Sequence, residues 1–324
     1  MNRARAILLS IFLAIAAVSL GLHWSANHTG SGATVLTEVA IQSPRGLRPF
    51  AQDKALLELM AVGRQTNGSA VYNHVLFNLY HAIWNKYGKG VQSPVILELG
   101  PGANLALGML LVAAGAKKYT GLDLFKDPDL ENPHSYTAAF DLLNLASPGS
   151  VRIRPEEIFS VSEGRVVFNP ARMEFLFPRQ SYDIRLPDGS VDFVFSHSVF
   201  EHISDPDKTI AAIHGVLRIG GISAHQFDMR DHTDFSRPLE FLKADEASWQ
   251  ARFSGEKARH YTNRRRLSDF VKAIERTGFK VLRVEVTEKV AMSAEIRKGL
   301  HPDFQKYSLE DLAVVGALIV AQKP

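Results

Sequence analysis

A glycine-rich turn and two acidic residues lie at the ends of two short apolar runs between residues 95 and 123. Glu98 lies two residues before the turn Gly100-Pro-Gly102, and Asp123 follows the next apolar run. Glycines between a strand and a helix let the backbone approach a ligand, and the first N–H groups of the helix bind an anionic group. A carboxylate at Glu98 suits an ammonium group, whereas one at Asp123 can accept hydrogen bonds from both hydroxyls of a ribose. S-adenosylmethionine has an amino-acid end and a ribose, so it is the cofactor that we expect here.

The same turn argues against a dinucleotide. The dinucleotide-binding fingerprint G-x-G-x-x-G needs a glycine at its sixth position, where this chain has Leu105. Glu98 would also do nothing for a pyrophosphate. A nicotinamide-dependent (NAD) oxidoreductase is therefore the disfavoured alternative function. A non-catalytic cofactor-binding or scaffold protein with the same fold is the other alternative.

Three histidines near the ends of later strands are candidates for a general base: His197, His202 and His225. The sulfonium of the cofactor already activates the methyl group, so the protein mainly aligns the reactants and excludes water. A base is needed only for an acceptor that loses a proton, as a hydroxyl does. The alternative role of each histidine is a helix cap, a core position or a contact at the edge of the cofactor.

Two polar segments stand out further along the chain. Residues 224–234 include two His and three Asp, and residues 264–266 are three consecutive Arg. The first segment suits acceptor recognition, a divalent cation or a hydrogen-bonded loop, and we assign no metal ligand in it. The arginines suit a phosphate or carboxylate acceptor, anionic headgroups or, as the favoured interpretation, the solvated start of a helix.

The elements that must position these residues follow from hydrophobic patterning. After Gly90, short β-rich runs alternate with helical runs, which indicates an α/β domain with a mostly parallel sheet. Apolar residues three and four apart predict helical segments within 53–87. Further helices are expected at 104–114, from about 204 to the glycine pair 220–221, and at 263–277. The seven expected strands are 95–99, 118–122, 173–177, 191–196, 222–226, 280–286 and 314–321.

These blocks resemble a known family. Glu98-Leu-Gly-Pro-Gly102 with Asp123 resembles the first two motifs of class I S-adenosylmethionine-dependent methyltransferases. Their fourth-strand motif and its continuation are similar to the stretches 186–196, 200–203, 205–206 and 216–221. The likeness covers about Val91 to Ala321 and implies a doubly wound, seven-stranded, mostly parallel sheet, the Rossmann-like methyltransferase fold.

The resemblance also implies roles for individual residues. Glu98, Gly100 and Gly102 would hold the methionine part of the cofactor, and Asp123 would hold the ribose. Asp183 matches the acidic residue that reaches the adenine amino group in many members, although its spacing to the following proline is only approximate. The third glycine often found in the first motif is replaced by Asn104.

The N-terminal residues differ in character from the rest. Arg3 and Arg5 precede an uncharged apolar run from Ala6 to Leu22, and the first acidic residue is Glu38. As a helix this run spans about 25 Å, at the short end of what crosses a bilayer. We favour an uncleaved membrane anchor. A cleaved signal peptide, a mitochondrial presequence and a buried helix are the alternatives.

The expected organisation is an N-terminal membrane anchor at 1–24, a tether and helical cap at 25–90, and a class I methyltransferase domain at 91–324. The net charge of +3, from 37 Lys+Arg and 34 Asp+Glu, does not suggest a nucleic-acid partner. The absence of cysteine removes disulfides and thiolate metal sites. We therefore expect methyl transfer to a small-molecule, lipid-linked or saccharide acceptor, by a membrane-associated enzyme whose domain faces the cytosol, where the cofactor is made.

Overall fold

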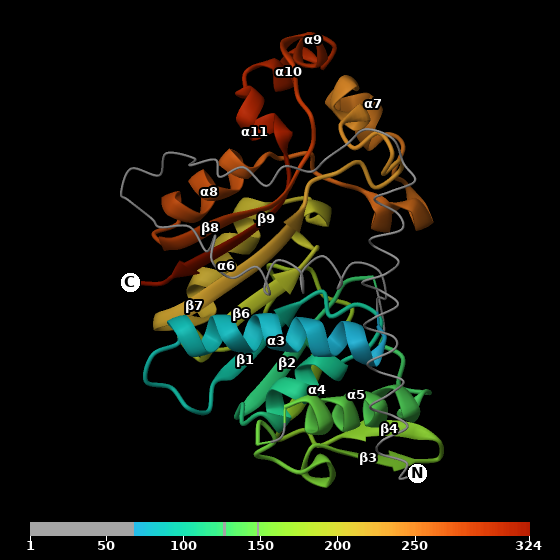
Figure 1. The fold of residues 1–324 in the computed structure, drawn as a ribbon, viewed down its shortest axis with the longest axis vertical. Coiled ribbons are helices and arrows are strands. Elements are labelled where there is room, and N and C mark those ends of the chain that lie inside the picture. The colour runs from blue at the N-terminus through green and yellow to red at the C-terminus, as the bar shows by residue number, and fades with distance from the viewer. Residues whose placement is uncertain (1–67, 126–127, 148) are drawn as a thin grey trace. The chain divides into compact units, whose positions relative to one another are not determined.

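The computed structural model describes residues 68–125, 128–147 and 149–324 (Figure 1). The predicted anchor at 1–24, the tether and the first part of the predicted helical cap lie outside the described residues. Among the helices that are described, none combines the length and the hydropathy that a membrane span requires.

A seven-stranded sheet runs through the described chain in the order β5-β2-β1-β6-β7-β9-β8. Five strands are parallel, whereas β9 runs antiparallel to both β7 and β8. The strands are β1 (Val95–Leu99), β2 (Lys118–Leu122), β5 (Met173–Leu176), β6 (Val191–His197), β7 (Leu217–Asp228), β8 (Lys280–Lys289) and β9 (Val314–Gln322). All seven predicted strands are present, and the prediction of a mostly parallel, Rossmann-like α/β fold is confirmed.

Strand β7 begins earlier than predicted. The glycine pair Gly220-Gly221 lies inside this strand and does not end the preceding helix, which stops at Val216. The pairing of β6 with β7 is irregular at this point, since Val191 pairs with Leu217 and the next pair joins Phe193 to Ile222. Residues 218–221 therefore bulge, and the glycines allow the bulge because Gly220 has a φ of +79°.

Helices cover both faces of the sheet (Figure 1). One face carries α3 (Ala70–Tyr87), α4 (Ala106–Ala113) and α5 (Pro133–Ala146), whose apolar residues share one core cluster. The other carries α6 (Pro206–Val216) and α8 (Leu267–Arg276), which share a second cluster. Successive side chains of a strand point to opposite faces of the sheet. Accordingly, Ile96 of β1 belongs to the first cluster and Leu97 to the second.

Helix α3 confirms the second of the helical segments that were predicted within 53–87. Ser69 caps its start by accepting a hydrogen bond from the backbone N–H of Tyr72 (3.1 Å). Leu76, Leu79, Tyr80 and Ile83, three and four residues apart, are all buried. The aromatic face of this helix thus packs on the sheet, and it brings tyrosines toward β1 and β6.

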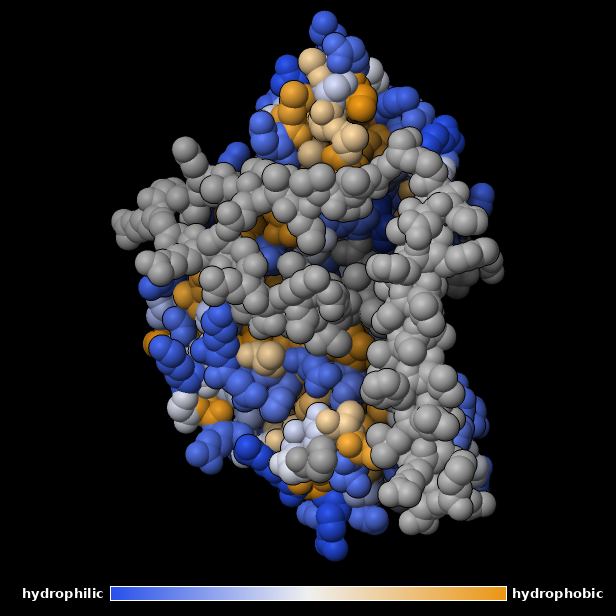
Figure 2. Space-filling model, in the orientation of Figure 1, coloured by the Kyte–Doolittle hydropathy of each residue, from blue (hydrophilic) through white to orange (hydrophobic). Residues whose placement is uncertain are grey.

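Several smaller elements were not predicted. They are the hairpin β3 (Phe159–Ser162) and β4 (Arg165–Phe168), the helices α7 (Glu246–Gln250), α9 (Ala294–Lys298), α10 (Pro302–Gln305) and α11 (Leu309–Ala313), and the 3₁₀ turns η1 (Pro155–Glu157), η2 (Phe200–His202), η3 (Glu240–Lys243) and η4 (Gly255–His260). Elements of three to six residues are too short to show a hydrophobic period. A third core cluster, which includes Trp249 of α7 and Leu312 of α11, packs these short helices together. We call the segments 239–261 and 290–313 the helical part. Figure 2 shows apolar surface near α9, where Ile296 is 42% exposed.

Candidate active site

The carboxyl ends of the parallel strands bring the predicted site residues to one edge of the sheet. Leu99, the last residue of β1, pairs with Leu122 of β2 on one side and with Ser196 of β6 on the other. The residues that follow these strands therefore lie along one edge, the edge at which open α/β sheets bind ligands.

The glycine turn after β1 is held close to both neighbouring strands. Gly100 and Gly102 have φ values of +65° and +76°, which L side chains rarely adopt. The backbone N–H of Gly100 donates to the carbonyl of Leu122 (2.8 Å), and a Cβ at Gly100 would lie 2.5 Å from Val199. The turn is thus a cradle that any larger residue would fill.

Asn104 replaces the third glycine of the motif and acts through its side chain. Its Oδ1 accepts a hydrogen bond from the backbone N–H of Ala106 (3.1 Å), at the first residue of α4. Its Nδ2 donates to the carbonyl of Gly68 (2.8 Å). The Asn104 side chain therefore binds the first N–H of α4 and ties it to Gly68, which precedes the Ser69 cap of α3.

Glu98 is a buried acid with one fixed partner. Its side chain is 3% exposed, and its Oε2 accepts a hydrogen bond from the Tyr119 hydroxyl (2.6 Å). Burial raises the pKa of Glu98 to about 8. The hydrogen bond from Tyr119 partly lowers this pKa, and the negative charge of Asp123 raises it further. An ammonium group beside Glu98 would favour its charged form and draw off the proton.

Asp123 directly follows β2 and is half-buried. Its Oδ1 accepts a hydrogen bond from the backbone N–H of Phe125 (2.8 Å), which fixes the side chain in a tight turn. Its carbonyl accepts a hydrogen bond from the backbone N–H of Arg179 (2.8 Å). The loop after β5 is thereby held beside Asp123.

Asp183 lies on that same loop and is bound to arginines. Its two oxygens accept hydrogen bonds from Arg179 (3.0 Å) and Arg185 (2.9 Å). The hydrogen bonds from Arg185 and Arg179 lower the pKa of Asp183. Its side chain is 36% exposed, and the backbone N–H of its partner Arg179 donates to the carbonyl of Asp123.

His197 ends β6 and faces the tyrosines of α3. Its Nδ1 lies 3.2 Å from the Tyr80 hydroxyl, and its ring meets Tyr72 edge-on at 6.3 Å between centroids. The Tyr80 hydroxyl also donates to the carbonyl of Ser196 (2.8 Å). Burial is the main cause that raises the pKa of Tyr72 and of Tyr80. The negative charge of Glu98 is the second cause for both residues and also raises their pKa. His197 therefore contacts both tyrosines, and the charge of Glu98 acts on the same two tyrosines.

The other two candidate bases have different surroundings. His225 lies within β7, is 2% exposed and has both ring nitrogens at hydrogen-bond distance from serine hydroxyls, Ser196 (2.8 Å) and Ser223 (2.7 Å). Burial lowers the pKa of His225 to about 3. This geometry gives His225 a place in the core and not in the site. His202 belongs to η2 and contacts His232 rather than the glycine turn.

Two of the three arginines are buried, so the interpretation as a solvated helix start is wrong for them, whereas Arg265 is partly exposed and pairs with Asp207. The helix begins only at Leu267, and Arg264 and Arg266 are 4% and 0% exposed. Arg264 donates to the carbonyls of Phe241 and Ala244, and Arg266 to those of Met229, Leu312 and Val314. Their guanidinium groups join loops of the helical part through backbone oxygens.

The sequence does not show that Tyr119, Tyr72 and Tyr80 lie around the acidic site. Tyr72 and Tyr80 are eight residues apart and so share one face of α3, a spacing that by itself indicates only a buried helix face. Tyr119 points to the same side of the sheet as Glu98 because Glu98 pairs with Gly121, two residues further along β2. Only the strand register makes this contact visible.

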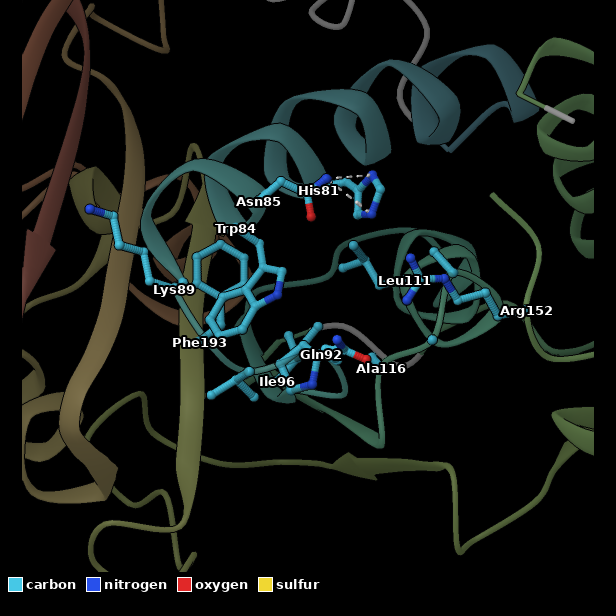
Figure 3. Close-up of a pocket in the computed structure, with 16 residues that line it drawn as sticks. His81, Trp84, Asn85, Lys89, Gln92, Ile96, Leu111, Ala116, Arg152 and Phe193 are labelled. Carbon is cyan, nitrogen blue, oxygen red and sulfur yellow. Dashed lines mark hydrogen bonds between the residues drawn. The ribbon is translucent and has the colours of Figure 1, made fainter. Parts of the chain in front are cut away.

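A separate cavity of about 380 Å³ lies at the opposite edge of the sheet (Figure 3). Ile96 near the start of β1 and Ala116 just before β2 line it. In Figure 3, Trp84 and Lys89 come from the end of α3 and its following loop, and Arg152 approaches from the other side. The cavity is at the amino ends of the strands and includes none of the predicted site residues.

Comparison with known proteins gives one family match. Residues 170–224, which cover β5, β6, α6 and the first part of β7, match a family described as a methyltransferase domain. No curated protein sequence matches the chain. The enzyme class and the cofactor predicted from the sequence are thus confirmed: the chain carries a methyltransferase domain of the kind that uses S-adenosylmethionine.

Solved structures also match the chain, at low identity. An S-adenosylmethionine-dependent methyltransferase from Mesorhizobium loti is 16% identical, with a TM-score of 0.41 over 79% of this chain and 99% of that chain. A putative methyltransferase from Bacillus halodurans is 14% identical, with a TM-score of 0.40 over 75% of this chain and 98% of that chain. A putative sarcosine dimethylglycine methyltransferase from Galdieria sulphuraria is 14% identical, with a TM-score of 0.41 over 78% and 88%.

Proposed function

We propose that the protein transfers the methyl group of S-adenosylmethionine to a small-molecule acceptor, with the cofactor between the glycine turn after β1 and Asp123 after β2. The observation that carries this proposal is the placement of two acids, Glu98 and Asp123, at the carboxyl ends of neighbouring parallel strands, with a glycine cradle between them. This arrangement fits a ligand that has an ammonium group at one end and a ribose at the other.

The amino-acid end fits the β1 side. Glu98 would accept hydrogen bonds from the ammonium group. At Gly100 there is no room for a side chain, because a Cβ there would meet Val199. The N–H of Ala106, the first residue of α4, already donates to Asn104, and the N–H of Leu105 donates to the Tyr136 hydroxyl. The carboxylate of the amino-acid end would therefore lie against the glycine turn that precedes them.

The nucleoside end fits the β2 side. Asp123 would accept hydrogen bonds from the two ribose hydroxyls. Asp183, which lies on the loop joined to Asp123 through Arg179, would accept from the adenine amino group at the rim. The roles of these residues follow from their order along the sheet edge.

The cofactor supplies a methyl group already activated by its sulfonium, so the chain needs to position the acceptor and to exclude water. Where the acceptor is a hydroxyl, we assign the general base to His197, which ends β6 next to the glycine turn. Tyr80 would orient this imidazole through the contact of its hydroxyl with Nδ1 (3.2 Å). The carboxyl ends of β6 and β7 then form the acceptor side.

The acceptor that we propose is lipid-linked or a saccharide, reached by an enzyme tethered through residues 1–24 with its domain on the cytosolic side. The support is the apolar run that follows Arg3 and Arg5 in the sequence. Protease treatment of sealed vesicles tests this orientation: the domain is digested from the cytosolic face, whereas protection on that face would contradict the proposal.

A thermal shift experiment tests the cofactor. We expect S-adenosylhomocysteine at 100 times its Kd to stabilise the protein by about 2.7 kcal/mol and to raise its Tm, because it binds only the folded chain. NAD at the same concentration should leave the Tm unchanged. Stabilisation by NAD alone would contradict the proposed function.

A transfer experiment tests catalysis. Protein incubated with methyl-labelled cofactor and a membrane or metabolite extract should give a labelled product, whose identification defines the acceptor. For a hydroxyl acceptor, we expect His197→Ala to slow transfer about 100-fold while the Kd for S-adenosylhomocysteine stays within twofold. Equal rates for His197→Ala and the wild type on such an acceptor would show that His197 is not the general base.

A further inference from the structure

Two short segments at the carboxyl ends of β6 and β7 bring a carboxylate and two imidazoles together. Glu201 and His202 belong to η2, and His232 lies four residues beyond the end of β7. One ligand atom from each of the three side chains lies within 4.8 Å of the other two. The rings of His202 and His232 are 4.8 Å apart between centroids. This Glu–His–His cluster shares no residue with the proposed cofactor site.

Two polar atoms of the cluster are buried without a hydrogen-bond partner in the part of the chain that the structure describes. They are Oε2 of Glu201 and Nε2 of His232. Glu201 is 2% exposed, and only its Oε1 is engaged, by the backbone N–H of Asp228 (3.2 Å). Burying an unpaired carboxylate oxygen is costly, so an unpaired atom in the core points to a missing partner.

His202 is held in the form that binds metal ions. Its Nδ1 lies 2.7 Å from the carbonyl oxygen of Tyr261. Because a carbonyl only accepts hydrogen bonds, Nδ1 carries the hydrogen, and the lone pair of the neutral ring is on Nε2. A backbone carbonyl that fixes the tautomer of a histidine is a common partner of metal-binding imidazoles.

The charges around the cluster leave room for a cation. Asp228 is already paired with Arg230, whose Nε donates to Oδ1 (2.8 Å). The distance from Asp228 Oδ1 to His232 Nε2, 3.7 Å, is too long for a hydrogen bond. Glu201 is therefore the one carboxylate of the cluster that has a free oxygen, and His202 and His232 offer imidazole nitrogens beside it.

We propose that Glu201, His202 and His232 bind a divalent transition-metal ion of the zinc class. Two imidazole nitrogens and one carboxylate oxygen suit zinc and its neighbours, whereas magnesium and calcium prefer oxygen ligands alone. Three protein ligands leave a coordination position open to water or to an oxygen of another ligand. The bound ion would join η2 to the segment after β7, on the acceptor side of the sheet.

Metal titration of the full chain tests this proposal. The chain is purified in detergent without a histidine tag, stripped with a chelator and titrated with Zn²⁺ by calorimetry, with Mg²⁺ as the comparison. We expect one equivalent of Zn²⁺ to bind and to raise the Tm, with no change from Mg²⁺. Co²⁺ in place of Zn²⁺ should give the visible absorption of a site with nitrogen ligands.

Variants locate the ion. His232→Ala should weaken Zn²⁺ binding at least tenfold and remove the Co²⁺ absorption, while His134→Ala, which changes an exposed histidine on α5, should alter neither. Glu201→Gln should weaken Zn²⁺ binding as well, with Glu156→Gln at an exposed position as its control. Unchanged Zn²⁺ binding in His232→Ala, loss of binding in His134→Ala, or equal responses to Mg²⁺ and Zn²⁺ would overturn the proposal. The Co²⁺ spectrum of the unaltered chain needs no variant: a spectrum without nitrogen ligation would also overturn it.

Discussion

Two buried glutamates lie near the same edge of the sheet, and they differ in what surrounds them. Glu98 of β1 is 3% exposed and Glu201 of η2 is 2% exposed, and burial is the main reason that the pKa of each is raised. The Tyr119 hydroxyl donates to Oε2 of Glu98. Oε2 of Glu201 has no hydrogen-bond partner among the described residues and faces two imidazoles.

The difference indicates which ligand each carboxylate suits. Glu98 lies beside a glycine cradle, so an organic ligand that brings its own ammonium group can reach it. Glu201 has nitrogen donors around it, so a metal ion suits it better. The two glutamates are equally buried and their pKa values shift in the same direction, yet they suit different ligands. The groups that surround each carboxylate determine which ligand it suits.

Replacing each glutamate by glutamine should give the largest difference between the two regions, measured as the affinity for S-adenosylhomocysteine. At pH 8 we expect Glu98→Gln to weaken S-adenosylhomocysteine binding about 100-fold, since a hydrogen bond to a charged group contributes roughly 1.5–3 kcal/mol. Glu201→Gln should leave this affinity within twofold. Calorimetric titration of both variants measures the difference, and equal losses would contradict the separation of the two sites.

Removal of the proposed ribose ligand should have the next largest effect. Asp123→Ala should weaken S-adenosylhomocysteine binding at least tenfold, because two hydroxyls lose their acceptor. Asp188→Ala, at an exposed turn, is the matched control and should have no effect. If Asp123→Ala binds as tightly as the wild type in the same titration, the ribose is not held there.

The pH dependence of binding should distinguish Glu98 from a permanently charged acid. With a pKa of about 8, Glu98 is mostly protonated at pH 6 and must lose its proton to pair with the ammonium group. Affinity for S-adenosylhomocysteine should therefore rise up to about tenfold between pH 6 and pH 7, with release of about one proton at pH 7. Above pH 8 it should fall again, because the ligand amine loses its charge.

Calorimetry in two buffers of different ionisation enthalpy counts the released proton. The Glu98→Gln variant serves as the control, since it has no carboxyl to deprotonate. An affinity that is flat from pH 6 to pH 7 in the wild type would show that the proton of Glu98 is not linked to binding.

The smallest effect is expected at the rim. Asp183→Ala should weaken S-adenosylhomocysteine binding only about threefold, because its side chain is partly exposed and already paired with arginines. Competition with adenosine and with a ribosylhomocysteine lacking adenine checks its contact: only the adenine-containing ligand should respond to the substitution. A loss as large as that of Asp123→Ala would place Asp183 inside the site.

The sequence was sufficient for the sheet and for the glycine turn, since both depend on local patterns. The strands appear as apolar runs, and Gly100 and Gly102 mark the turn at the end of one of them. The partners of the acids were not predictable, because Tyr119 meets Glu98 through strand register. The Glu–His–His cluster was missed for a similar reason: its segments are thirty residues apart in sequence and meet only in the fold.

Buried charge also escaped prediction. The run of arginines before α8 looks like solvated surface in sequence, yet Arg266 is fully buried and donates to three carbonyl groups. Carbonyl groups belong to every residue, so the sequence does not show which loops will present them to a guanidinium. The replacement of a motif glycine by Asn104 was visible, whereas its bonds to Gly68 and Ala106 were not.

A crystal structure of the complex with S-adenosylhomocysteine tests the central claim most directly. We predict that the ligand amine lies within hydrogen-bond distance of Glu98 or of the turn at Gly100, and that both ribose hydroxyls contact Asp123. A ligand bound elsewhere, or its ribose turned away from Asp123, would contradict the proposed cofactor site.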